Sequence, residues 1–335
     1  MLKRNTLLRH EYFLNDYISK IGNYSVSQFK SSLGPELWLD GYYNGTEEMK
    51  AKTAEAAMME KSRRNCFPKI TRDSKEYRRL DFSFIPDYGF LGSMEPMLKN
   101  VELKLCFDRE PASLSIVDYD SAPGTDHSIL DNPWTIKECH AVVEYVSSPD
   151  LRALYETIQS SPMVYNYDDS EVLIRSLPKG DTNIRIDAIH GGPIPSHLFA
   201  ALIPSSYLTG DRENSATIFE QHGVKEFNIN INGHSVNGYP VKCAQGAATY
   251  PLLKWVESTN RLHNNIAGES LSLANFHQNF IWSHYFETEE TANGWITLDF
   301  KLETAYTINM SLVIWIIQPM TLTIDRYNQV EKSKI

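Results

Sequence analysis

Residues 226–240 restrict the fold of this chain more than any other segment. Apolar side chains at 227, 229 and 231 alternate there with polar ones, and the alternation ends at Asn232-Gly233. A period of two places neighbouring side chains on opposite faces of a strand, and Asn-Gly favours the positive φ angles of a two-residue hairpin. The segment therefore predicts a β-hairpin with one face in a core, and it makes His234 the first residue after the turn. A second Asn-Gly pair, at 237–238, is expected to redirect the chain.

Similar strand-like segments recur along most of the chain. They lie at residues 77–85, 101–107, 113–119, 137–146, 171–177, 183–189, 197–203, 226–231, 294–302 and from 307 onward. Helical segments interrupt them at 46–64, after 148, at 249–263 and after 270. Many short strands without a regular strand–helix alternation predict an all-β fold with helical insertions, built as an antiparallel β-sandwich.

Three segments carry more specific expectations. Residues 305–324 hold no charged side chain and have the length of a membrane span. Their period of two instead favours a long strand, half-buried at first and buried on both faces from Val313 onward, so we expect no membrane span. The polar run 165–170 (YNYDDS) and the glycine-containing run 189–195 (IHGGPIP) are predicted to be turns.

Charge and cysteine usage indicate where the chain is made. The formal net charge is −10, which argues against direct nucleic-acid binding because phosphate contacts need a basic face. The cysteines are Cys66, Cys106, Cys139 and Cys243, and none forms a CxxC pair. Such spacing is typical of neither a disulfide-stapled secreted domain nor a zinc site. The first residues lack the apolar stretch of a signal peptide, so we expect a reducing intracellular compartment and no secretion.

Candidate chemistry is sparse. The pairs His277/His284 and His190/His197 are each seven residues apart, which is not the tight spacing of a catalytic zinc site. There is no nucleophile elbow, phosphate-binding glycine loop or arguable carboxylate dyad. We therefore expect no catalytic, cofactor-binding or metal-ligating residues. Four tryptophans stand among apolar neighbours and are expected to be core or interface anchors rather than a sugar-stacking row: Trp255, Trp282, Trp295 and Trp315.

Three segments, in their order along the chain, resemble a known family. They are residues 80–114, residues 195–241 with the Leu208-Thr209-Gly210 turn and the Asn232-Gly233 hairpin, and residues 316–330 with their IDRYNQV tail. Each is similar to a segment of the double jelly-roll capsid proteins of Polinton/Maverick elements and adintoviruses, and of related endogenous open reading frames. Each motif is loose, and their shared order is the specific signal.

The resemblance implies a double jelly roll that lacks the N-terminal strands of its first roll, because the match begins inside that roll. Residues 1–160 would form the partial first roll, with a helical insertion at 1–76. Residues 161–335 would form the second roll, with a helical insertion at about 245–280.

The function that the resemblance implies is structural. The chain would be a major capsid protein that forms homotrimers, and these pseudo-hexagonal capsomers would tile an icosahedral virion. Its partners would be further copies of itself and a minor capsid or penton protein. The candidate subunit-contact residues are Trp255, Leu252 and Leu253 in the second insertion, and Tyr42 and Tyr43 in the first.

Two other classes of function stay open. A β-sandwich binding module would recognise a glycan or a protein through its loops, without catalysis. A metal-dependent jelly-roll enzyme would hold a bound metal ion.

Overall fold

The computed structural model describes residues 69–72, 75–78, 104, 135–140 and 162–334, the last range with gaps at 178, 210–218, 244–247, 260–275, 277–279, 287–292, 326 and 328. The strands are β1 (Lys69–Arg72), β2 (Lys75–Arg78), β3 (Met163–Leu177), β4 (Asn183–Pro193), β5 (His197–Pro204), β6 (Val224–Ile231), β7 (His234–Ser235), β8 (Val241–Lys242), β9 (Trp282–Tyr285), β10 (Asn293–Leu302), β11 (Met310–Ile324) and β12 (Val330–Lys334). The helices are α7 (Ser205–Thr209) and α8 (Thr249–Ser258).

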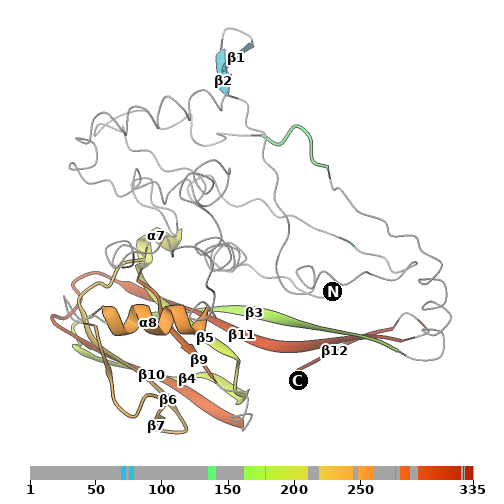
Figure 1. Ribbon diagram of the computed structural model, residues 1–335. Helices are drawn as coiled ribbons and strands as arrows, with labels where there is room; N and C mark the ends of the chain where they lie inside the picture. The colour runs from blue at the N-terminus through green and yellow to red at the C-terminus, as the bar shows by residue number, and fades with distance from the viewer. Residues whose placement is uncertain are drawn as a thin grey trace.

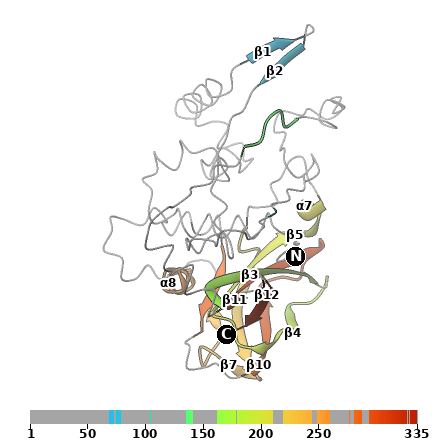
Figure 2. The ribbon, with the colours of Figure 1, turned by 90° about the vertical axis from the view of Figure 1, so that its right-hand side faces the viewer.

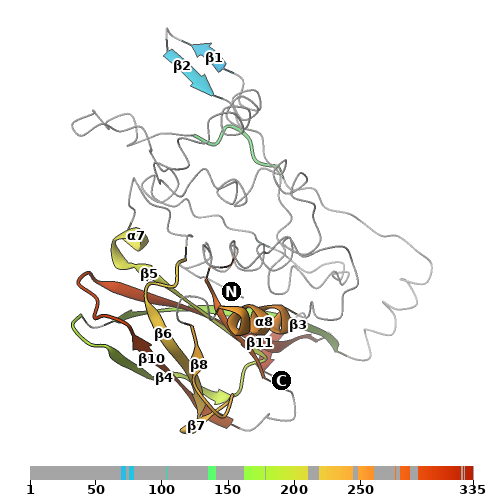
Figure 3. The same cartoon turned by 60° about the vertical axis from the view of Figure 1, so that its left-hand side comes forward.

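Two antiparallel sheets lie face to face in the C-terminal half (Figures 1 and 3). Leaving aside β7, which also pairs with β6, and β12, which also pairs with β11, one sheet has the order β3-β11-β5-β9, and the other has the order β4-β10-β6-β8. Counted along the chain, these strands are the first, eighth, third and sixth, and the second, seventh, fourth and fifth. That is the strand order of a jelly roll. The predicted antiparallel β-sandwich is therefore confirmed, whereas most of the predicted first roll lies outside the described residues.

The hairpin predicted at Asn232-Gly233 is confirmed. Asn232 has a φ of 52° and Gly233 a φ of 85°, and Ile231 pairs with His234 across the turn. The Asn232 side-chain oxygen also accepts a hydrogen bond of 2.9 Å from the Trp295 backbone N–H. The turn residue therefore ties β6 to the beginning of the neighbouring strand β10.

Aromatic side chains join the two sheets. The Trp282 ring on β9 lies 5.3 Å from Phe227 and 5.6 Å from Phe300, which belong to the opposite sheet. The Trp282 indole N–H donates to the Cys243 sulfur at 3.2 Å. Burial raises the pKa of the Cys243 thiol to about 12, so this cysteine is a neutral part of the core.

Strand β11 reverses one expectation. Every residue from Met310 to Ile316 is buried, and alternation begins only at Ile317. The first half is the more deeply covered because it lies between β3 and β5. The Trp315 ring there meets Phe219 edge-on at 5.5 Å. The strand is thus buried on both faces first and half-buried later, the opposite of the predicted order.

Both predicted turns are strand residues. Residues 165–170 belong to β3, because each of them pairs with β11. Gly191 and Gly192 belong to the end of β4 and pair with β10. Long-range pairing overrides the local turn preference at both places.

The far halves of β3 and β11 continue beyond β5, and β12 pairs with β11 there (Figure 1). A Lys332–Asp169 ion pair of 2.6 Å joins β12 to β3 across this extension. Tyr165, Leu322 and Ile324 form a small apolar cluster within it, separate from the main core.

We expect Gly233→Val to destabilise the folded chain by roughly 1–2 kcal/mol, because a side chain there meets the steric cost of the left-handed region. Asn232→Gly keeps the allowed backbone and removes only the bond to Trp295, so its cost is expected to be smaller. Urea unfolding followed by fluorescence measures both. Equal stability of Gly233→Val and the wild type would contradict this account of the hairpin.

Candidate subunit-contact site

Helix α8 covers one side of the sandwich (Figure 2). It packs along β9 and touches β8, which are edge strands of the two sheets. An uncovered strand edge exposes backbone groups to pairing with other chains, and covering it with a helix removes that risk. The helix therefore closes this edge and turns its outward residues to the surface.

Trp255 belongs to the interior of its own chain. Its side chain is only 1% exposed, and its ring meets Phe199 of β5 edge-on at 5.5 Å. A side chain covered in this way has no surface left for a neighbouring subunit. This corrects the expectation for Trp255, which anchors α8 on the sandwich instead.

The other candidate contact residues fall in different places. Leu253 is 47% exposed on α8, whereas Leu252 is partly buried and packs against the core. Tyr42 and Tyr43 lie outside the described residues. Subunit contact through α8 stays a prediction, and Leu253 is the residue that can carry it.

Two tyrosines that the sequence did not single out lie just before α8 and in its first turn, the second of them three residues before Leu253. Burial raises the pKa of Tyr250, in the first turn of α8, and the neighbouring Tyr239, in the loop after β7, adds to this effect. Lys254 pairs with Glu257 at 2.7 Å and stands 5.8 Å above the Tyr250 ring. We call Tyr239, Tyr250, Leu253, Lys254 and Glu257 the α8 surface. The spacing of its helical members, 250, 253, 254 and 257, is the sequence signal that could have revealed it.

The histidines mostly serve packing. His190 contacts the Pro193 carbonyl oxygen at 2.8 Å, and His197 packs against Tyr285 at 4.9 Å. His234 is exposed, and His277 lies outside the described residues. Among the residues that the structure describes, no group of three His, Cys, Asp or Glu side chains could hold a metal ion.

Two partly buried histidines have strongly lowered pKa values. Burial lowers the pKa of His222 to about 4, and its Nε2 atom has no hydrogen-bond partner among the described residues. Burial also lowers the pKa of His284 to about 4, with Lys254 adding to the effect and Glu257 opposing it. Both imidazoles are therefore neutral near pH 7.

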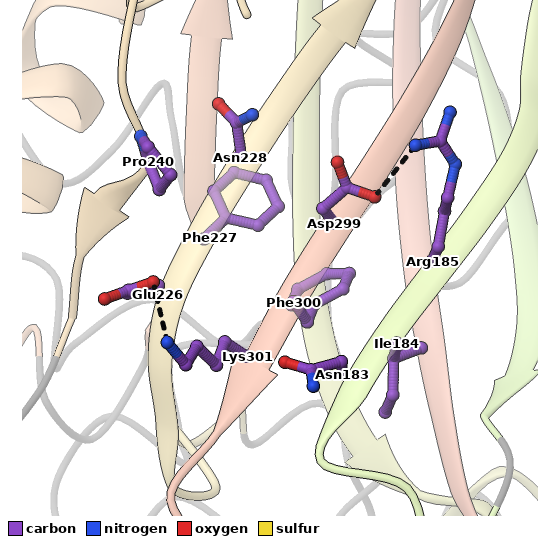
Figure 4. A pocket seen from close by; sticks show the side chains of 10 residues that line it. All are labelled: Asn183, Ile184, Arg185, Glu226, Phe227, Asn228, Pro240, Asp299, Phe300 and Lys301. Carbon is purple, nitrogen blue, oxygen red and sulfur yellow. Dashed lines mark ion pairs between the residues drawn. The ribbon is translucent and has the colours of Figure 1, made fainter. Parts of the chain in front are cut away.

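A shallow hollow of about 250 Å³ lies over the outer face of the β4-β10-β6 sheet (Figure 4). Ion pairs cross it: Glu226 and Lys301 are 3.7 Å apart, and Arg185 and Asp299 are 3.9 Å apart. These charges are matched between neighbouring strands and exposed to solvent. Such an arrangement is typical of a solvated sheet face and offers no group prepared for catalysis.

Within the described part of the chain, no helix has the length and apolarity needed to cross a membrane. Residues 310–324 of the uncharged segment are strand β11.

The chain is similar to solved structures of virus particles and of viral capsid proteins. It matches a structure of the Sputnik virophage (11% identity, TM-score 0.37, 52% of this chain and 39% of that one). It also matches PBCV-1 VP54 fitted into a Sputnik reconstruction (11% identity, TM-score 0.37, 56% of this chain and 55% of that one). A third match is the mavirus major capsid protein (10% identity, TM-score 0.30, 52% of this chain and 41% of that one). The chain thus spans between 39% and 55% of these structures. At such TM-scores the likeness carries no argument, and the jelly-roll assignment rests on the strand order.

No protein-family model and no curated protein matches the sequence.

We expect Trp255→Ala to lower the free energy of unfolding by about 3–5 kcal/mol, because it leaves a large cavity between α8 and β5. Leu253→Ala, two residues away on the exposed side of the same helix, should change it by less than about 0.5 kcal/mol. Denaturant titration of both variants at low protein concentration measures the difference. A neutral Trp255→Ala would show that α8 is not anchored through this ring.

Stability should fall as the pH drops from about 6.5 to 4. Unfolded histidines take up a proton near pH 6.5, whereas His222 and His284 stay neutral in the folded state down to about pH 4. The unfolded state therefore binds more protons in this window, so acid favours unfolding. Thermal melting across the window should show a smaller pH dependence for His284→Gln than for the wild type. The exposed residue His234 provides the control, and His234→Gln should keep the full slope.

Proposed function

We propose that this chain is a structural subunit of a viral-type capsid, of the Polinton and adintovirus kind that its sequence resembles. The observation that carries the proposal is the complete jelly-roll strand order from β3 to β11, interrupted between β8 and β9 by the segment that contains α8. Fold alone does not assign function. The support comes from this order together with the matching order of family-like segments in the sequence.

The sandwich has the physical properties that a shell subunit needs. Its antiparallel sheets bury an aromatic core, and α8 covers the β9 edge. A rigid unit with one covered edge presents defined surfaces to its neighbours and does not polymerise through open strands. Capsid assembly would use such surfaces repeatedly.

The α8 surface is the proposed contact between copies. It combines two tyrosines and a leucine with a Lys254–Glu257 pair of opposite charges. Tyrosine and other large side chains within a polar margin are typical of protein interfaces. The proposed assemblies are homotrimers that tile an icosahedral shell, together with a minor capsid or penton protein. The proposed location of the chain is the virion.

We expect Leu253→Asp to weaken self-association at least tenfold while the chain stays folded, because the new carboxylate would be desolvated in the contact. Ile308→Asp is the matched control: Ile308 is 53% exposed but precedes β11, away from α8. Sedimentation velocity over a concentration series compares the two variants with the wild type. Unchanged assembly of a folded Leu253→Asp chain would overturn α8 as the contact.

A further inference from the structure

One aromatic side chain stands out on the polar outer face of the β4-β10-β6 sheet. Trp295, near the start of β10, is 62% exposed, whereas Trp255, Trp282 and Trp315 are buried. Trp295 is therefore not a core residue, and only the interface half of the expectation stays open for it. A single exposed apolar side chain is ordinary on a protein surface, so the case for Trp295 rests on how its ring is held.

The ring of Trp295 has a built seat. Trp295 pairs with Gly191 on the edge strand β4, and a Cβ atom at Gly191 would lie 2.6 Å from the Trp295 ring. The absence of a side chain at 191 is thus what lets the ring rest against the backbone of β4. Asn232 holds the residue from the other side, because its backbone N–H donates to the Trp295 carbonyl oxygen at 3.0 Å. The glycine at 191 has its physical reason here, whereas Gly192 is explained by its φ of 116°.

Strand β4 also changes its register beside this ring. Ile296 pairs with His190 and Leu298 with Ile186, so residues 187–189 lie opposite Thr297 alone. Ala188 within this bulge has a φ of 51°, a conformation that residues with a side chain rarely adopt. Bulges and such strained residues are enriched next to functional sites, where they re-aim a side chain.

The bulge residue Asp187 is a fixed polar neighbour of this region. Its carboxylate accepts a hydrogen bond of 2.8 Å from the Arg185 guanidinium and one of 3.5 Å from the Thr297 hydroxyl. Thr297 is the next residue after Trp295 on the same face of β10, but it is only 7% exposed. Its hydroxyl therefore helps to hold the Asp187 carboxylate, which is the solvent-facing group on this side of the ring. Asn230, cross-strand from Thr297, bonds to Asp299 at 2.6 Å.

We propose that Trp295 is the stacking platform of a carbohydrate-binding site, with the exposed Asp187 carboxylate as its hydrogen-bonding group. A sugar ring has an apolar C–H face that fits an exposed indole, and hydroxyl groups that need polar partners around that indole. An anchor for a protein partner is instead surrounded by contacts that exclude water, whereas the side chain bonded to Trp295 belongs to the polar and exposed Asn232. The seat on Gly191 restricts the ring before binding, which lowers the entropy lost on binding. This site does not depend on capsid assembly.

A purely structural role for the ring makes a different prediction. Aromatic side chains placed over a cross-strand glycine can stabilise an edge strand. That role predicts a lower melting temperature for Trp295→Ala and no retained glycan. Binding and melting therefore have to be measured on the same preparations.

The test applies the full chain to a printed array of neutral and acidic oligosaccharides. The wild type should bind a subset of them, and Trp295→Ala should weaken that binding at least tenfold. Gly191→Ala should also weaken it, because the new methyl group displaces the ring without removing it. Asp187→Asn changes an exposed side chain and leaves the Trp295 ring in place. Weaker glycan binding by this variant would show that the Asp187 carboxylate contacts the sugar, even if the other variants fold poorly. Tyr327→Ala is the control, since Tyr327 is 67% exposed in the turn before β12.

Three outcomes would overturn the proposal. The first is full glycan binding by both Trp295→Ala and Asp187→Asn. The second is an array on which no oligosaccharide gives a signal above background with the wild type. The third is a Trp295→Ala variant that no longer self-associates in sedimentation but binds glycans as the wild type does, which would make the ring a protein contact. Failure of the α8 contact would affect only sedimentation and not the array, so the two proposals fail separately.

Discussion

Pairing along β11 is the constraint on which the rest of the sandwich depends. This strand pairs with β3 over its whole length, with β5 over its first half and with β12 over its end. Its first half is buried on both faces, with Phe219 against the Trp315 ring. It is apolar there except for Ser311, whose hydroxyl is hydrogen-bonded to that of Ser205. Pro319 stands where pairing with β5 has ended at Ile317 and pairing with β12 has not begun until Met320. A residue without an N–H group is tolerated in a strand at such a position.

The two sheets treat their outer faces differently. On the sheet that contains β5 and β9, helix α8 covers apolar side chains, and its Trp255 ring packs on Phe199 of β5. Over β4, β10 and β6, the outer side chains form ion pairs and hydrogen bonds near solvent. This asymmetry separates two proposed activities: contact between copies at the edge closed by α8, and ligand binding on the open polar face.

The local patterns of the sequence predicted what short-range physics determines. Period-two alternation and Asn232-Gly233 predicted β6 and its hairpin, because strand faces and turn φ angles are local properties. The errors occurred where distant residues decide. Residues 165–170 look like a turn until β11 pairs with them, and Gly191 looks like a turn until the Trp295 ring rests on it. Trp255 and Leu253 are two residues apart, and only the docking of α8 makes one core and the other surface.

The central claim is that this sandwich is a self-assembling structural subunit. Cryo-electron microscopy of the purified full chain over a concentration series tests it most directly. The account predicts ring-shaped trimers whose repeating unit contains the β3–β11 jelly roll, with α8 in the contact between copies. Particles that stay monomeric at every concentration, with α8 exposed to solvent, would contradict it.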